Sequence, residues 1–165
     1  MKAKMFRALL PLAIVFTMFS CSSDDSAENA TENRVVTTYN YNETELRLVT
    51  LINNHRQSIG LNTLEVINHI SYKSEEHNLY MIDNNVVNHD YFQRRSDNLI
   101  QVLGAERVGE NIAYNYQMAE SAFSAWMHSP AHRANIEGDY THFGVSVTTD
   151  NQTGRKYYTN MFMKR

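Results

Sequence analysis

The C-terminal end of the chain carries the alternating pattern of a β-hairpin. Phe143, Val145 and Val147 alternate with small or polar residues, as expected for a strand with one buried face. The residues DNQTG then supply a turn, and KYYTNMFM alternates again as a return strand. The chain is therefore expected to end in an antiparallel pair of strands.

The first half of the folded region has the periodicity of helices instead. Apolar residues at helical spacing predict helices over residues 43–58 and 64–83. Residues 84–95, NNVVNHDYFQRR, lose this periodicity and are expected to form a loop. A brief helix is predicted over residues 96–104, between a serine that can cap it and a glycine that can end it.

The segments before the hairpin add a strand and two further helices. RVGENIAYN is strand-like, and MAESAFSAWMHS is helical with Trp126 on its apolar face, which places Trp126 in the core. Proline is tolerated at the first position of a helix, so Pro130 can start a new short helix with Ser129 as its N-cap and His132 in its first turn. This order of elements predicts an α+β fold with a small antiparallel sheet flanked by helices.

The N-terminus has the layout of a secretory signal. Residues 1–20 begin with basic side chains and continue with about twelve apolar residues, too few for the ~20 that a membrane-spanning helix needs. Cys21 follows, and the segment resembles a bacterial lipoprotein signal in which this cysteine receives the lipid. Residues 21–41 are acidic and poor in apolar side chains, so we expect a flexible tether between a membrane and a domain over residues 42–165. Acidic residues just after the cysteine also resemble surface-export signals of some Gram-negative lipoproteins, which suggests the outer membrane surface as the site of the anchor.

Charge and cysteine content narrow the classes of function. The net charge is −3, whereas a nucleic-acid partner would favour a basic face. Cys21 is the only cysteine in the chain, so the domain is expected to be held together by packing without disulfides.

Three residues could form a site for chemistry. His89 lies in the predicted loop, Glu110 on the predicted strand and His132 at the start of a short helix. Two imidazoles and a carboxylate are sufficient to hold a divalent metal with an open coordination position. Spacing alone does not bring the three together, because they are 21 and 22 residues apart and the chain contains no HExxH motif.

Four motifs, in order, resemble those of the CAP family, which comprises cysteine-rich secretory, antigen 5 and pathogenesis-related-1 proteins. They are NHDYFQRR, GENIAYN, AFSAWMHSPAHRANI and HFGVSV. The resemblance covers about residues 46–164 and is greatest to the cysteine-poor bacterial branch. It implies a three-layer α-β-α sandwich and a cleft lined by two histidines and two acidic residues.

The resemblance also assigns positions in that cleft. His89 and His132 match its two histidines, and Glu110 matches the glutamate of the GEN motif. Ser129 occupies the place of the second acid, so the site loses one negative charge and its affinity for a metal such as zinc should be reduced. Glu110 is expected to orient a histidine or to hold a metal-bound water, in preference to ligating the metal directly. Asn111 faces the opposite way along the strand and is expected to bond a neighbouring loop.

The remaining histidines are assigned structural or solvent-facing roles. His77 is expected to be partly buried with a hydrogen bond, and His55 and His69 to be solvated. His128 is not expected to be a ligand, because Pro130 interrupts the helix before His132. His142 flanks a hairpin strand and is a candidate for lining the cleft.

Three functions remain open at this stage, because CAP proteins share no single reaction and a fold does not fix a function. In the first, the domain binds a divalent metal or a small ligand at the cell surface. In the second, it is a metal-assisted hydrolase of peptide or cell-wall material, with Glu110 as general base. In the third, it is a structural surface module with an inert cleft. A Ser129–His132–Glu110 triad is disfavoured, since a serine three residues before its histidine, across a proline, is poorly placed to point at it.

Overall fold

The structure is a computed structural model that describes residues 34–165; the signal segment, Cys21 and the first part of the expected tether lie outside these residues. The elements, in chain order, are α2 (Glu43–Ser58), β1 (Glu65–Val66), α3 (Asn68–Asp83), α4 (Phe92–Leu103), β2 (Arg107–Tyr114), α5 (Ala119–His128), α6 (Pro130–Ile136), β3 (His142–Thr149) and β4 (Lys156–Lys164). Within residues 34–165, no helix is long and apolar enough to cross a membrane.

The sheet has four strands in the order β1-β3-β4-β2. The predicted hairpin is confirmed as β3 and β4, and β2 pairs antiparallel with the other side of β4. The expected antiparallel sheet is present as β2, β4 and β3, and the short strand β1, which was not predicted, pairs in parallel with β3 and makes the sheet mixed. Strand β2 is left at one edge, where Glu110 lies opposite Met161 of β4.

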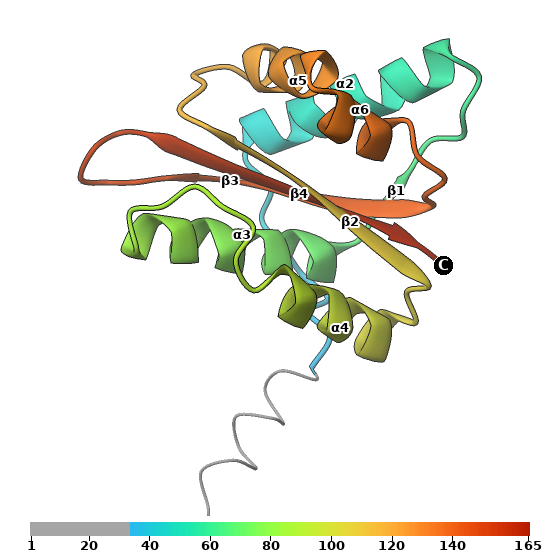
Figure 1. Ribbon diagram of the computed structural model, residues 1–165, viewed down its shortest axis with the longest axis horizontal. Helices are drawn as coiled ribbons and strands as arrows, with labels where there is room; N and C mark the ends of the chain where they lie inside the picture. The colour runs from blue at the N-terminus through green and yellow to red at the C-terminus, as the bar shows by residue number, and fades with distance from the viewer. Residues whose placement is uncertain (1–33) are drawn as a thin grey trace, which may run out of the picture.

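Helices cover both faces of this sheet (Figure 1). Helices α2, α5 and α6 lie on one face, and α3 and α4 lie on the other. The three-layer α-β-α sandwich implied by the family resemblance is confirmed, and with it the α+β class.

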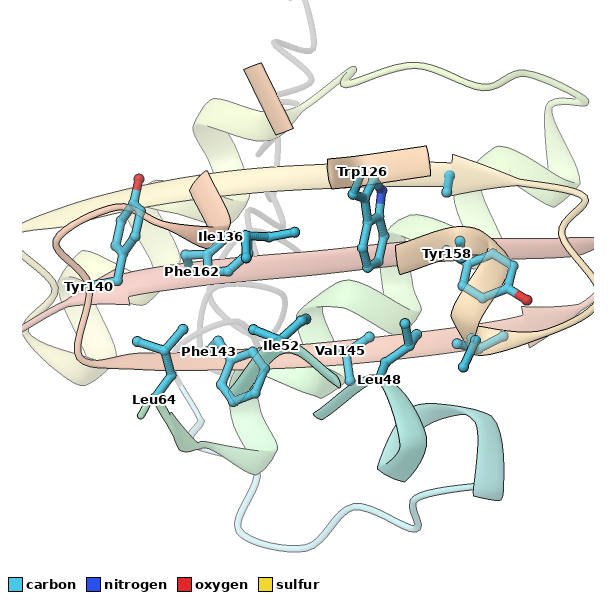
Figure 2. Close-up of a cluster of buried hydrophobic side chains, with 14 residues drawn as sticks. Leu48, Ile52, Leu64, Trp126, Ile136, Tyr140, Phe143, Val145, Tyr158 and Phe162 are labelled. Atoms are coloured by element: carbon cyan, nitrogen blue, oxygen red, sulfur yellow. The ribbon is translucent and has the colours of Figure 1, made fainter. Parts of the chain in front are cut away.

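The main core lies between the sheet and the layer of α2, α5 and α6 (Figure 2). Trp126 is 1% exposed, as predicted, and its Nε1 donates a hydrogen bond of 2.8 Å to the Ile112 carbonyl. Side chains from α2, α6 and both hairpin strands belong to the same core cluster: Leu48, Ile52, Ile136, Phe143, Val145, Tyr158 and Phe162. Burial of this apolar surface is the main contribution to stability in a domain that uses no disulfide.

Two helix boundaries differ from the predictions. Helix α3 begins at Asn68, because Glu65 and Val66 extend along β3 instead of starting the helix. Helix α4 begins at Phe92, inside the predicted loop, because Tyr91 adopts a left-handed conformation (φ 58°) that turns the chain into the helix. Its end at Gly104, also left-handed, is as predicted.

The last part of the segment predicted as a tether packs on the domain. The Tyr39 hydroxyl donates to Ser146 Oγ (3.0 Å), and the Tyr41 hydroxyl donates to Asn68 Oδ1 (3.1 Å). The Val36 amide donates to Nδ1 of His69 (3.1 Å), whose Nε2 bonds Asn98. The expectation that His69 is solvated is therefore wrong: His69 is 1% exposed and links the N-terminal segment to α3 and α4.

Candidate functional site

The candidate site lies at the edge of the sheet formed by β2. Along this strand the side chains alternate, so Glu110 faces the layer of α3 and α4 whereas Asn111 faces α6. Side chains from the layer of α5 and α6 contact the outer edge of β2. Asn135 donates a hydrogen bond to the Glu110 carbonyl (3.2 Å), and Trp126 donates one to the Ile112 carbonyl. The outer edge of β2 is thus covered from the layer of α5 and α6.

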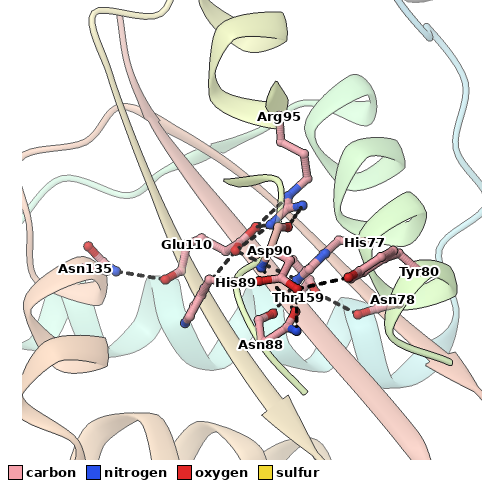
Figure 3. Close-up of polar contacts among 10 residues, drawn as sticks. All are labelled: His77, Asn78, Tyr80, Asn88, His89, Asp90, Arg95, Glu110, Asn135 and Thr159. Carbon is pink, nitrogen blue, oxygen red and sulfur yellow. Dashed lines mark hydrogen bonds and ion pairs between the residues drawn. The ribbon is translucent and has the colours of Figure 1, made fainter. Parts of the chain in front are cut away.

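Glu110 is the centre of a buried polar cluster (Figure 3). Its side chain is 2% exposed, and both carboxylate oxygens accept hydrogen bonds from the guanidinium of Arg95, at 2.9 Å from Nε and 2.8 Å from Nη2. Paired bonds of this kind are the strongest that a carboxylate makes with a side chain. Glu110 is therefore held in one orientation by the fold itself.

The same carboxylate sets the orientation of His89. The Nδ1 of His89 lies 2.8 Å from Glu110 Oε1 and donates to it, so the hydrogen of a neutral ring is on Nδ1. The Nε2 atom then carries a free lone pair, and the side chain is 49% exposed. The predicted role of Glu110 as a residue that orients a histidine agrees with this geometry.

Contacts from α3 and α4 hold the loop that carries His89. His77 donates from Nε2 to the Asn88 carbonyl (2.8 Å), and Arg95 donates from Nη1 to the Asp90 carbonyl (2.7 Å). Burial is the main cause that lowers the pKa of His77, so its ring is neutral at neutral pH. His77 is thus buried with a hydrogen bond, as expected, and it helps to position His89.

His132 approaches from the other layer. It lies on α6, half-buried, and its carbonyl accepts a hydrogen bond of 2.9 Å from Asn111, whose own Oδ1 accepts from Asn135. Burial is the main cause that lowers the pKa of His132, and protonation of His89 would lower it further. Asn111 has a structural role, as predicted, but it bonds the backbone of α6 where a neighbouring loop was expected.

Two other predicted members contribute less. Ser129 occupies the N-cap position of α6, but its side chain makes no capping hydrogen bond, so the predicted cap is wrong in that respect. His142 lies at the junction of β1 and β3, where its Nδ1 bonds Thr141 (2.7 Å) and its Nε2 is 3.6 Å from Glu65. The sheet order separates His142 from the β2 edge, so it does not join His89 and His132.

The remaining histidines lie outside the site. His55 is only partly solvated, because its Nε2 bonds Glu137 (2.9 Å). His128 is exposed and bonds the carbonyl of Ser124 within its own helix. In the described part of the chain, no hydrogen bond or ion pair joins either of them to Glu110.

Arg95 is the functional residue that the sequence pattern did not reveal. It lies in the segment predicted as loop, yet it is 8% exposed and bonded to Glu110. One signal could have pointed to it: a carboxylate on a buried strand needs a cationic partner, and Arg94 and Arg95 follow His89 closely.

The donor set limits what the site can hold. Among residues 34–165, no group of three or more histidine, cysteine, aspartate or glutamate side chains is arranged to hold a metal ion. Glu110 is already engaged by Arg95 and His89. His89, whose side chain is 49% exposed, and the half-buried His132 remain as the candidate donors.

The fold is an α-β-α sandwich in which the edge strand β2 carries a glutamate bonded to a histidine of the α3–α4 connection. The chain belongs to the CAP family, described as the cysteine-rich secretory protein family, whose model it matches over residues 49–162.

Three similar proteins come from bacteria. The chain is 48% identical over 61 residues to the uncharacterized membrane protein YlbC of Bacillus subtilis, a match that covers 36% of this chain and only 16% of YlbC. An outer surface protein of Borrelia burgdorferi has the same fold, with a TM-score of 0.68 at 18% identity over 79% of this chain and 99% of its own. An extracellular protein of Bacillus anthracis that contains an SCP domain is 26% identical, with a TM-score of 0.63 over 74% of this chain and 40% of its own.

Proposed function

We propose that this protein is an extracytoplasmic, membrane-anchored CAP domain whose cleft at the β2 edge binds a divalent metal, zinc in the first instance, through His89 and His132. The location is supported by the described relatives, which are an outer surface protein, an extracellular protein and a membrane protein. It is also supported by the signal-like segment before Cys21. The anchor in this proposal is a lipid on Cys21, which makes the membrane a partner.

The observation that carries the metal proposal is the hydrogen bond between His89 and Glu110. A histidine that binds a metal through one nitrogen usually donates the other N–H to a carboxylate or a carbonyl, which fixes the tautomer and makes the free nitrogen more basic. His89 has this arrangement, with its Nδ1 at 2.8 Å from the Glu110 carboxylate. The lowered pKa of His132 keeps its ring neutral, as a metal ligand must be.

Two histidines make a weak and open site. Zinc has three protein ligands in typical catalytic sites and four in structural sites, so two coordination positions here would be filled by water or by groups of a bound molecule. Ser129, at the position of the second acid, contributes no negative charge. The proposed site is therefore suited to holding a metal together with a further ligand.

The hydrolase alternative is less well supported. A general base must accept a proton from the attacking water. Both oxygens of Glu110 already accept hydrogen bonds from Arg95, and one of them also accepts from His89. Glu110 is therefore suited to positioning His89 and poorly suited to taking up a proton.

Calorimetric titration with zinc tests the proposal. The unchanged protein should bind one zinc ion, and both His89→Ala and His132→Ala should weaken binding by about tenfold or more. His128→Ala is the matched control, because His128 is an exposed histidine outside the cleft and its loss should leave the affinity unchanged. Equal affinity in all four proteins, or no binding in any, would favour the structural module.

A further inference from the structure

Asn160 of β4 is a buried side chain without a hydrogen-bond partner. It is 0% exposed, and neither the oxygen nor the nitrogen of its amide has a partner in the described part of the chain. Buried polar side chains are nearly always paired, because an unpaired one loses its bonds to water without replacement. Asn160 therefore points to a second arrangement of the structure in which its amide is paired.

Asn111 is the partner that Asn160 can reach within the sheet. The two residues stand directly opposite each other in the antiparallel pair of β2 and β4. Directly opposite side chains lie on the same face of a sheet, with Cβ atoms about 4.5–5.5 Å apart. The neighbour of Asn160 on its other side is Val145 of β3, whose side chain has no polar group.

In the structure, the amide of Asn111 is bonded to α6 instead. Its nitrogen donates to the His132 carbonyl (2.9 Å), and its oxygen accepts from Asn135 (2.8 Å). If the side chain turned to Asn160, these two bonds would be replaced by bonds between the two amides. The groups released on α6 would then be hydrated, so no polar group would be left unpaired and the two arrangements differ little in hydrogen bonding.

Helix α6 is held firmly at only one end. At its C-terminal end, Arg56 donates to the carbonyls of Ile136 (2.8 Å) and Gly138 (2.9 Å). At its N-terminal end Ser129 makes no capping hydrogen bond, and Ile136 is the one buried residue of the helix. Segments with few buried apolar contacts open locally at a low free energy. His132 lies near the loosely held end and would move with it.

We propose that Asn111 is a latch with two positions, and that Asn111 and Asn160 are positioning residues for His132. In the closed position, which the structure shows, Asn111 holds the backbone of His132 against β2. In the open position Asn111 bonds Asn160, and the N-terminal end of α6 moves away from the strand. The latch deepens the function proposed above and rests on it for one consequence: a metal bound by His89 and His132 would favour the closed position.

Hydrogen exchange of the α6 amides, followed by NMR in the metal-free protein, tests the latch. Asn160→Leu preserves the approximate size of the side chain and removes the partner that the open position requires. The amides of residues 133–136 should then exchange about tenfold more slowly than in the unchanged protein, since the opening loses about one net hydrogen bond. Unchanged or faster exchange would overturn the proposal.

Two further variants separate the latch from a general change in stability. Asn111→Leu removes the latch, so the α6 amides should exchange faster, and adding Asn160→Leu should have no further effect; an equal slowing on that background would also overturn the proposal. Thr159→Val is the matched control, because Thr159 is a buried polar residue of β4 that bonds Asn78 of α3 (2.7 Å), and α6 exchange should be unchanged. Slowed α6 exchange in Asn160→Leu, together with no zinc binding, would overturn the metal proposal and support the latch.

Discussion

The ion pair between Arg95 and Glu110 yields a direct test of how the site is built. Replacement of Arg95 by leucine leaves the carboxylate of Glu110, 2% exposed, without its two guanidinium bonds. Removal of one partner of a buried pair typically costs about 3–5 kcal/mol. We expect a value near ~3 kcal/mol, the lower end of that range, because His89 remains as a donor to Glu110.

The perturbation is best interpreted with a second substitution. If the cost comes from an uncompensated buried charge, adding Glu110→Gln to Arg95→Leu should recover stability, although Glu110→Gln alone should be destabilising. The coupling energy between the two changes should then be at least ~1.5 kcal/mol, within the range for residues in one hydrogen-bonded network.

Urea denaturation measures these free energies of unfolding. Trp126 is the only tryptophan and is 1% exposed, so its fluorescence reports loss of the core. With a slope of about 1–3 kcal/mol per molar urea, Arg95→Leu should lower the midpoint by on the order of 1–3 M. Arg94→Leu, in the neighbouring exposed position, is the control and should have a much smaller effect. Additive costs in the double variant would refute the reasoning.

Two further predictions concern the close packing of α3 on the sheet and the buried histidines. Gly144→Ala should destabilise the domain by on the order of 3 kcal/mol in the same urea assay, because the new Cβ would lie 2.3 Å from the backbone nitrogen of Ser71; an unchanged midpoint would show that α3 can move away. Stability should also fall as the pH drops below about 6.5, since burial lowers the pKa of His69 and His77 in the folded state and the unfolded chain binds the extra protons first. A thermal unfolding series from about pH 7 to 5 checks this, and the decline should be shallower in a protein carrying His69→Gln and His77→Gln.

The sequence predicted best those features that depend on local periodicity. The hairpin and α2 follow from alternating and helical patterns, and the third layer follows from the family resemblance. The start of α4 was missed because Tyr91 takes a backbone conformation normally associated with glycine. Strand β1 was missed because two residues are too few to show a period.

The site was predicted only in part, because its contacts join segments that are distant in the sequence. His89, Glu110 and His132 could be named from their motifs, but the sequence did not show which residues contact one another. Arg95 reaches Glu110 only because α4 begins early enough to carry its side chain towards β2. The environment of His69 likewise depends on partners 29 and 33 residues away, which no local pattern reveals.

The position of the candidate site at a covered sheet edge has a mechanical consequence. His89 belongs to the connection between α3 and α4 on one side of the sheet, and His132 belongs to α6 on the other. A ligand bound by both imidazoles would connect the two sides of β2 and so link the two helical layers of the sandwich to each other. Ligand binding at this site would then oppose the sliding of one helical layer over the other, including in parts of the layers far from the binding atoms.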